Sequence, residues 1–161
     1  MGVGPALRIE PGVRLCIGGG WARGGVARMA KTFGQMVEEA RAHVPAVSPA
    51  EAQRRVKENP HTLLIDVQDS KDVQACGLIP GAVPISLGML AIRADQELPV
   101  AYRDARLQDR ARPVIVTCGA GGQGALGAYQ LQQMGFTDVA FIDGGMAAWK
   151  DAGLPTEPFQ G

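Results

Sequence analysis

The chain has 161 residues, of which 46% are hydrophobic and 20% are charged. This length fits one ordinary domain, and the composition is that of a globular protein that can build its own core. Sixteen lysines and arginines balance sixteen aspartates and glutamates, so no strong basic field predicts a nucleic acid or a membrane surface as the partner.

The cysteine content argues for a reducing compartment. Cys16, Cys76 and Cys118 form no C-x-x-C pair, and such a sparse, odd set favours a reduced protein over a disulfide framework or a zinc site. No window reaches the apolar length of a transmembrane helix, and the N-terminus lacks the apolar region of a secretory signal. We therefore expect a cytoplasmic protein that binds no metal ion.

Residues 1–28 differ in composition from the rest of the chain. They are rich in glycine, show no helical or strand period, and carry four arginines against one glutamate. This predicts either a disordered tail or an upstream extension included in error before a natural start at Met29. We expect an N-terminal helix in residues 29–46, from the spacing of Phe33, Met36, Val37 and Ala40, and a folded domain in residues 47–158.

Within that domain, helix and strand patterns alternate. Ser48-Pro49-Ala50-Glu51 reads as a capping box, with Ser48 as the N-cap and Glu51 reaching back, and the helix should end near Asn59-Pro60. Buried-strand patterns follow at 62–67, 82–86, 113–117 and 138–142, and helices are expected at 88–95, 125–134 and 146–152. This alternation predicts a single α/β domain with a central parallel sheet flanked by helices on both faces.

A charged loop separates the second and third expected strands. Its four arginines, at positions 103, 106, 110 and 112, are expected to form a solvated face. Trp149 in the last helix is expected to be a core aromatic residue.

The loop CGAGGQ, which begins at Cys118, carries the chemical signal. Cys118 leaves a buried strand and precedes a helix, where the exposed amides and the helix dipole favour an anion, and the thiolate is the reactive form of cysteine. The glycines let the backbone curl so that several N–H groups face one centre, which would also stabilise a persulfide or a bound oxyanion. The alternative is a buried, inert cysteine at a strand end.

Two other interpretations of this loop are disfavoured. Residues 119–124 match the dinucleotide-binding pattern G-x-G-x-x-G, but too few residues follow Gly124 to build the half-domain on which the cofactor lies. A cysteine phosphatase needs an arginine at the sixth position after its cysteine, and that position is Gly124.

Three ordered segments together resemble the rhodanese-like domain family from about Val47 to Pro155. They are LLIDVQDSKDVQACGLIPGAVPIS, PVIVTCGAGGQGALGAYQLQQMGF and DVAFIDGGMAAWKDAGLP. The resemblance implies a single-domain sulfurtransferase in which Cys118 takes a sulfane sulfur as a persulfide and passes it to a thiophilic acceptor. It implies thiosulfate, polysulfide or a persulfidated protein as the donor, and no cofactor. The implied substrate-binding residues are Gly119, Ala120, Gly121, Gly122, Gln123 and Gly124, with Asp66 and Gln68 in support.

The chain departs from the family pattern at positions that usually carry charge or hydrogen-bonding capacity. Gln68 stands where the family commonly has arginine, Leu78 replaces the usual histidine, and Gln123-Gly124 replaces Arg-Ser. Fewer charge-assisted hydrogen bonds predict weak capture of dianionic thiosulfate, with a protein persulfide or an uncharged polysulfide as the better donor. The alternative is a catalytically weak or inactive rhodanese-like binding or regulatory module. Asp66 is expected to have a structural role, accepting backbone hydrogen bonds near the loop.

Overall fold

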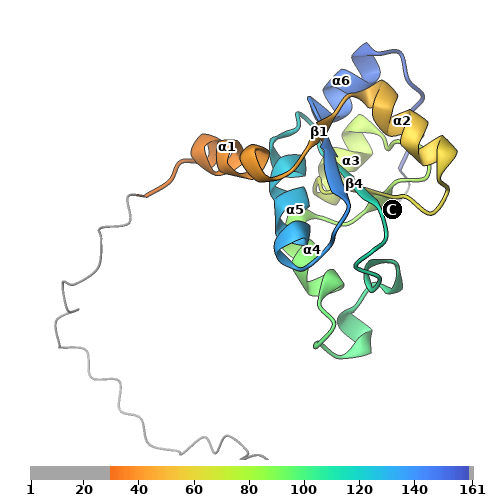
Figure 1. The fold of residues 1–161 in the computed structure, drawn as a ribbon. Helices are drawn as coiled ribbons and strands as arrows, with labels where there is room; N and C mark the ends of the chain where they lie inside the picture. Colours follow the sequence, from red (N-terminus) through yellow and green to blue (C-terminus); the bar gives the residue numbers. More distant parts are fainter. Residues whose placement is uncertain (1–29, 160–161) are drawn as a thin grey trace, which may run out of the picture. The chain divides into compact units, whose positions relative to one another are not determined.

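A five-stranded parallel sheet forms the centre of the computed structural model, which describes residues 30–159 (Figure 1). The strand order is β1-β5-β4-β2-β3, and every neighbouring pair is parallel. The strands are β1 (Ala46–Val47), β2 (Leu63–Asp66), β3 (Val83–Pro84), β4 (Val114–Thr117) and β5 (Val139–Ile142). All four residues of β2, β4 and β5 are buried, as continuous apolar runs predict. The expectations for residues 1–28 lie outside the described residues.

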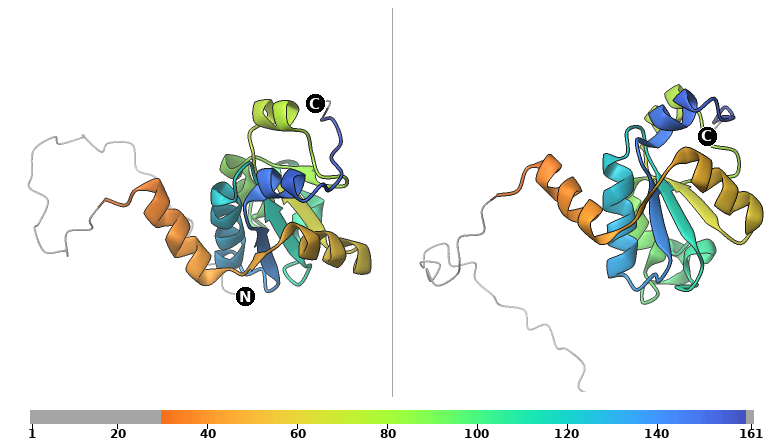
Figure 2. Two further views of the ribbon diagram at one scale, coloured as in Figure 1. Left: turned by 90° about the horizontal axis from the view of Figure 1, so that it is seen from above. Right: turned by 45° about the horizontal axis from the view of Figure 1, so that its top comes forward.

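Helices cover both faces of this sheet (Figure 2). One face packs against α1 (Phe33–His43), α4 (Leu87–Ala94) and α5 (Gly122–Gln133), and the other against α2 (Pro49–Glu58), α3 (Ser70–Cys76) and α6 (Gly145–Asp151). Neighbouring strand residues alternate between the two cores: Val116 belongs to the first, while Ile115 packs with Trp149 in the second. The predicted α/β fold is therefore confirmed. Between residues 30 and 159, no helix is long and apolar enough to cross a membrane.

The N-terminal caps explain where α1 and α2 begin. The Ser48 hydroxyl accepts the Glu51 N–H (3.2 Å), as predicted. Glu51, however, does not reach back to Ser48, because its carboxylate pairs with the guanidinium groups of Arg54 and Arg55 (2.8 and 2.7 Å). Charge-assisted pairs are stronger than a hydrogen bond to a neutral amide, so the predicted capping box is only half formed. A complete box lies instead at the start of α1, between Thr32 and Gln35.

Two helices differ from the expected pattern. The short helix α3 lies in a segment expected to be irregular, and Val73 is its buried residue. The helix α5 begins at Gly122, three residues before the expected start and inside the cysteine loop. Gly121 has a φ of 92°, and this left-handed conformation, which favours glycine, turns the chain into the helix at once.

The prediction of a solvated arginine face holds for Arg106, which is exposed, but is wrong for the other three arginines, which are partly buried. Arg110 donates to the carbonyls of Leu107 (2.9 Å) and Ala94 (2.6 Å), and its guanidinium lies over the Phe136 ring. Irregular backbone leaves carbonyl groups without ladder partners, and the guanidinium, with five N–H donors, can satisfy several of them. Two more of these arginines also donate to backbone carbonyls: Arg103 to Leu98 and Arg112 to His61.

Candidate active site

The predicted site residues gather at the carboxyl end of the sheet. Cys118 directly follows β4, the middle strand, and Asp66 ends the neighbouring strand β2, where it lies opposite Thr117 in the register. Gln68 follows two residues after Asp66. Ligands of open parallel α/β sheets bind outside the carboxyl ends of the strands. The structure thus brings Cys118, Asp66 and Gln68 to the end of the sheet where a ligand is expected.

The Cys118 sulfur is buried and hydrogen-bonded. Cys118 is 2% exposed, and its Sγ accepts the N–H of Gly121 at 3.1 Å. Gly121 is the N-cap residue of α5, so this donor stands at the positive end of the helix dipole. A hydrogen-bond donor at this place favours a negative charge on a sulfur atom. The negatively charged thiolate is the form of cysteine that attacks a sulfur donor.

The first turn of α6 holds the cysteine loop through backbone contacts. The Met146 N–H donates to the Cys118 carbonyl (2.7 Å), and the Ala147 N–H donates to the Gly119 carbonyl (3.0 Å). Gly145 has a φ of 57°, and a Cβ atom placed on it would lie 2.2 Å from the Cys118 carbonyl oxygen. Only glycine fits this contact, so the shape of the loop depends on the turn after β5.

Asp66 fixes the side chain of Gln68. Asp66 is fully buried and accepts the Gln68 backbone N–H at Oδ1 (3.0 Å) and the Gln68 Nε2 group at Oδ2 (3.1 Å). Burial raises the pKa of the Asp66 carboxyl, and these two hydrogen bonds offset part of that rise. Because the amide nitrogen is held by Asp66, Oε1 faces the loop, 3.1 Å from where a Cβ on Gly119 would stand. An acceptor therefore lies where the family commonly has a guanidinium.

The remaining loop positions divide between helix and surface. Ala120 and Gln123 are exposed, and Gln123 lies in the first turn of α5. Gly124 is buried, and a Cβ placed there would lie 3.4 Å from the Val116 carbonyl oxygen. Leu78, which replaces the family's histidine, is buried in the core on the opposite face of the sheet and pairs with Glu157 through backbone hydrogen bonds.

Two sets of charged side chains were not placed at the site from the sequence: Arg41 beside the loop, and Arg93 with Arg106 beside Gln68. Arg41 of α1 lies beside Gly121: its Nη2 would be 3.4 Å from a Cβ there. Arg93 and Arg106 line a polar pocket of about 340 Å³ that adjoins Gln68. The spacing of Phe33, Val37 and Arg41 along one helix face could have indicated Arg41. No comparable pattern in the sequence indicated Arg93 and Arg106.

The sheet and this loop define an α/β domain with a cysteine at the carboxyl end of its middle strand. A sequence model of the rhodanese-like domain matches residues 48–152. A structure of a Rhodopseudomonas palustris protein of unknown function, described as a possible tyrosine phosphatase, is 30% identical, with a TM-score of 0.74, and covers 83% of this chain and 100% of its own. The polysulfide-sulfur transferase homodimer of Wolinella succinogenes is 29% identical, with a TM-score of 0.62 and coverages of 80% and 88%.

A rhodanese-like domain from an Anabaena protein is also similar, at 27% identity and a TM-score of 0.58, with 71% of this chain and 80% of that chain covered. The family match spans more than half of the chain, and it agrees with the three segments quoted from the sequence. This chain belongs to the rhodanese-like family.

Proposed function

We propose that this protein is a sulfurtransferase that carries a sulfane sulfur on Cys118 as a persulfide. The observation that carries the proposal is the 3.1 Å hydrogen bond from the Gly121 N–H to the Cys118 Sγ. It places a backbone N–H donor on the cysteine sulfur at the carboxyl end of the sheet, the end where ligands of parallel α/β sheets bind. The similarity to the Wolinella polysulfide-sulfur transferase supports the same chemistry.

The reaction has two displacement steps. The Cys118 thiolate attacks the terminal sulfane sulfur of the donor, a new S–S bond forms, and the donor's own bond to that sulfur breaks with its electron pair. Sulfite leaves from thiosulfate, or a polysulfide one sulfur shorter leaves from polysulfide. A thiolate or cyanide then attacks the outer sulfur of the persulfide, and the Cys118 thiolate is released. This is covalent catalysis of the ping-pong type.

The environment of Gln68 favours an uncharged polysulfide or a protein persulfide over thiosulfate. A guanidinium would give a dianion charge-assisted hydrogen bonds worth about 1.5–3 kcal/mol each. Gln68 carries no charge, one N–H of its amide donates to Asp66, and its oxygen, an acceptor, faces the loop. The burial of Cys118 also favours a donor whose sulfane sulfur ends a slender chain, as in a polysulfide or a cysteine persulfide.

The same geometry argues against phosphate chemistry, which the description of the Rhodopseudomonas relative suggests for that protein. Cysteine phosphatases clamp phosphate with an arginine at the position of Gly124. Here that position is a buried glycine packed against the backbone of Val116 and Thr117. We therefore propose sulfur rather than phosphate as the transferred group.

Intact mass spectrometry after incubation with polysulfide tests the proposal. We expect one added sulfur on the wild-type protein and on Cys76→Ser, in which the half-buried thiol of α3 is removed. We expect none on Cys118→Ser, and cyanide should discharge the added sulfur as thiocyanate. No addition at Cys118 from polysulfide, thiosulfate or a protein persulfide would contradict the proposal and favour a rhodanese-like binding or regulatory module.

A further inference from the structure

The helix α1 lies outside the region matched by the family, yet it contacts the cysteine loop. Phe33, Val37 and Arg41 are spaced four residues apart and so lie on one face of α1. A Cβ placed on Gly122 would be 3.2 Å from the Phe33 ring and 3.5 Å from a Val37 methyl group. This face therefore packs directly on the residue that begins α5.

Arg41 reaches the two backbone segments that shape the loop. Its Nη2 donates to Asp143 Oδ1 at 2.9 Å, and its guanidinium lies 5.0 Å from the centre of the Phe141 ring. The same Nη2 would be 3.4 Å from a Cβ on Gly121, the residue whose N–H donates to the Cys118 sulfur. One side chain thus contacts both the strand end of β5 and the N-cap of α5.

Asp143 connects this ion pair to the cysteine. It directly precedes Gly144 and Gly145, and the Gly144 nitrogen would be 2.9 Å from a Cβ on Gly121. Gly145 in turn contacts the Cys118 carbonyl group. A displacement of Asp143 would therefore move the turn that fixes the Gly121 N–H beneath the sulfur.

The attachment of α1 to the domain does not depend on Arg41. Ala40 and Val44 are buried in the core, the His43 ring stacks on Tyr129 (4.7 Å), and Gln132 donates to the His43 carbonyl. The Arg41 and Asp143 side chains are 38% and 57% exposed, and ion pairs this exposed contribute little to stability. Because the ion pair of Arg41 and Asp143 contributes little to stability, its position beside the cysteine loop points to another role.

We propose that Arg41 is a positioning residue for sulfur transfer, and that α1 is part of the catalytic unit. Through Asp143 and Gly121, Arg41 holds the Gly121 N–H on the Cys118 sulfur, and its positive charge stands beside a loop that lacks the family's arginines. This inference rests on the proposed function and adds to it a residue from outside the family's matched region.

The test uses the full chain with Cys16→Ser and Cys76→Ser, so that Cys118 is the single thiol. The rate constants for sulfur uptake from polysulfide and for alkylation by iodoacetamide are measured by intact mass, together with the melting temperature. Arg41→Gln should lower both rate constants about tenfold with little change in melting temperature. Arg41→Lys, which keeps the charge, should recover part of the loss. Asp143→Asn should reproduce the loss, and the double variant should show no further loss.

Arg54→Gln is the matched control, because Arg54 is also exposed and paired with carboxylates but lies on α2, on the other face of the sheet. It should leave both rate constants unchanged. Wild-type rate constants for Arg41→Gln, or equal losses for Arg41→Gln and Arg54→Gln, would overturn the inference. If the wild-type protein takes up no sulfur, the proposed function fails, and the alkylation rate constants still decide the role of Arg41.

Discussion

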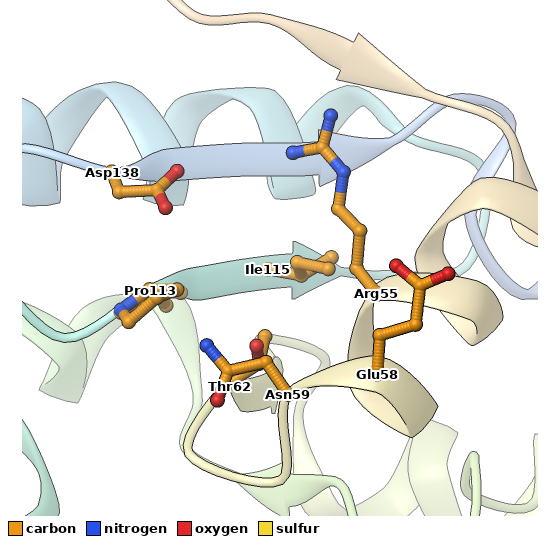
Figure 3. Close-up of a pocket in the computed structure, with 8 residues that line it drawn as sticks. Arg55, Glu58, Asn59, Thr62, Pro113, Ile115 and Asp138 are labelled. Atoms are coloured by element: carbon orange, nitrogen blue, oxygen red, sulfur yellow. The ribbon is translucent and has the colours of Figure 1, made fainter.

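The two ends of the parallel sheet both carry polar side chains, but they differ in what holds those groups. At the carboxyl end, the Cys118 sulfur accepts a backbone N–H, the cysteine loop is held by backbone hydrogen bonds, and Gln68 donates to Asp66. The amino end has a pocket of about 250 Å³ between α2 and the starts of β4 and β5 (Figure 3). Its charged lining residues are Arg55, Glu58 and Asp138.

The difference shows that charge is a poor guide to the reactive site in this fold. The amino-end pocket has three charged lining residues, as does the pocket beside Gln68 at the carboxyl end, but the amino-end lining includes no cysteine, serine or histidine, and Arg55 is already paired with Glu51. At the carboxyl end the charged side chains lie around the cysteine loop, but the Cys118 sulfur itself accepts a backbone N–H, so the chemistry there depends on where the backbone places N–H groups. Changes to backbone shape at the carboxyl end should therefore have larger effects than changes to charge at the amino end.

The largest effect is expected from Gly145→Ala. The new Cβ would stand 2.2 Å from the Cys118 carbonyl oxygen, and because that atom is backbone, the turn or the loop must shift. We expect a loss of about 3 kcal/mol or more in the free energy of unfolding, measured by urea denaturation, and a loss of most sulfur uptake at Cys118.

Gly153→Ala provides the matched control for this prediction. Gly153 also has a left-handed φ, 68°, but a Cβ placed there meets nothing within 4 Å. We expect it to cost about 1 kcal/mol, for the conformation alone, and to leave sulfur uptake unchanged. Equal effects of the two substitutions would show that backbone strain, rather than contact with the cysteine loop, explains the role of Gly145.

The sequence was sufficient to predict four of the five strands, the alternation with helices and the position of the loop. It missed β1, because Ala46 fell within the range expected to be the N-terminal helix, which ends at His43. Short continuous apolar runs such as the one that contains Ile65 are typical of a strand buried on both faces. The loop's supports could not be predicted in the same way. The contact of Gly145 with Cys118 and the contact of Arg41 with Gly121 join residues far apart in the chain, and no local pattern specifies them.

The arginines of the loop between α4 and β4 illustrate the same limit. Local composition correctly indicated an irregular, charged segment, but the partners of Arg110 are backbone carbonyls, whose positions follow from the fold. The early start of α5 has a more local cause, the left-handed conformation at Gly121. In a run with several glycines, the sequence does not show which one adopts it.

A smaller effect is expected from Gln68→Arg, which adds charge at the carboxyl end. Gln68 lines the 340 Å³ pocket, so a longer side chain has space, and Asp66 can accept from the guanidinium as it now accepts from the amide. We expect the rate of sulfur uptake from thiosulfate to rise about tenfold relative to uptake from a protein persulfide, because one charge-assisted hydrogen bond to a dianion is gained. Intact mass against time measures both rates.

Gln68→Met separates two explanations of that gain. It removes the acceptor that faces Gly119 without adding charge, in a side chain of similar size. We expect the thiosulfate rate of Gln68→Met to stay well below that of Gln68→Arg. A methionine variant as fast as the arginine variant would mean that the acceptor oxygen, and not the missing guanidinium, limits thiosulfate capture.

The smallest effect is expected at the amino end, from Asp138→Asn in the charged pocket of Figure 3. The Asp138 side chain is exposed, and it is the backbone carbonyl that accepts the Val114 N–H (2.9 Å) and joins β5 to β4. Asparagine keeps that carbonyl and the shape of the side chain, so we expect a stability change within about 0.5 kcal/mol and unchanged sulfur uptake by intact mass. A lower uptake rate in a variant with wild-type stability would mean that the amino-end charges act on Cys118 through the length of β4. The contrast between the two ends would then have to be abandoned, because backbone placement at the carboxyl end would no longer be sufficient to explain the site.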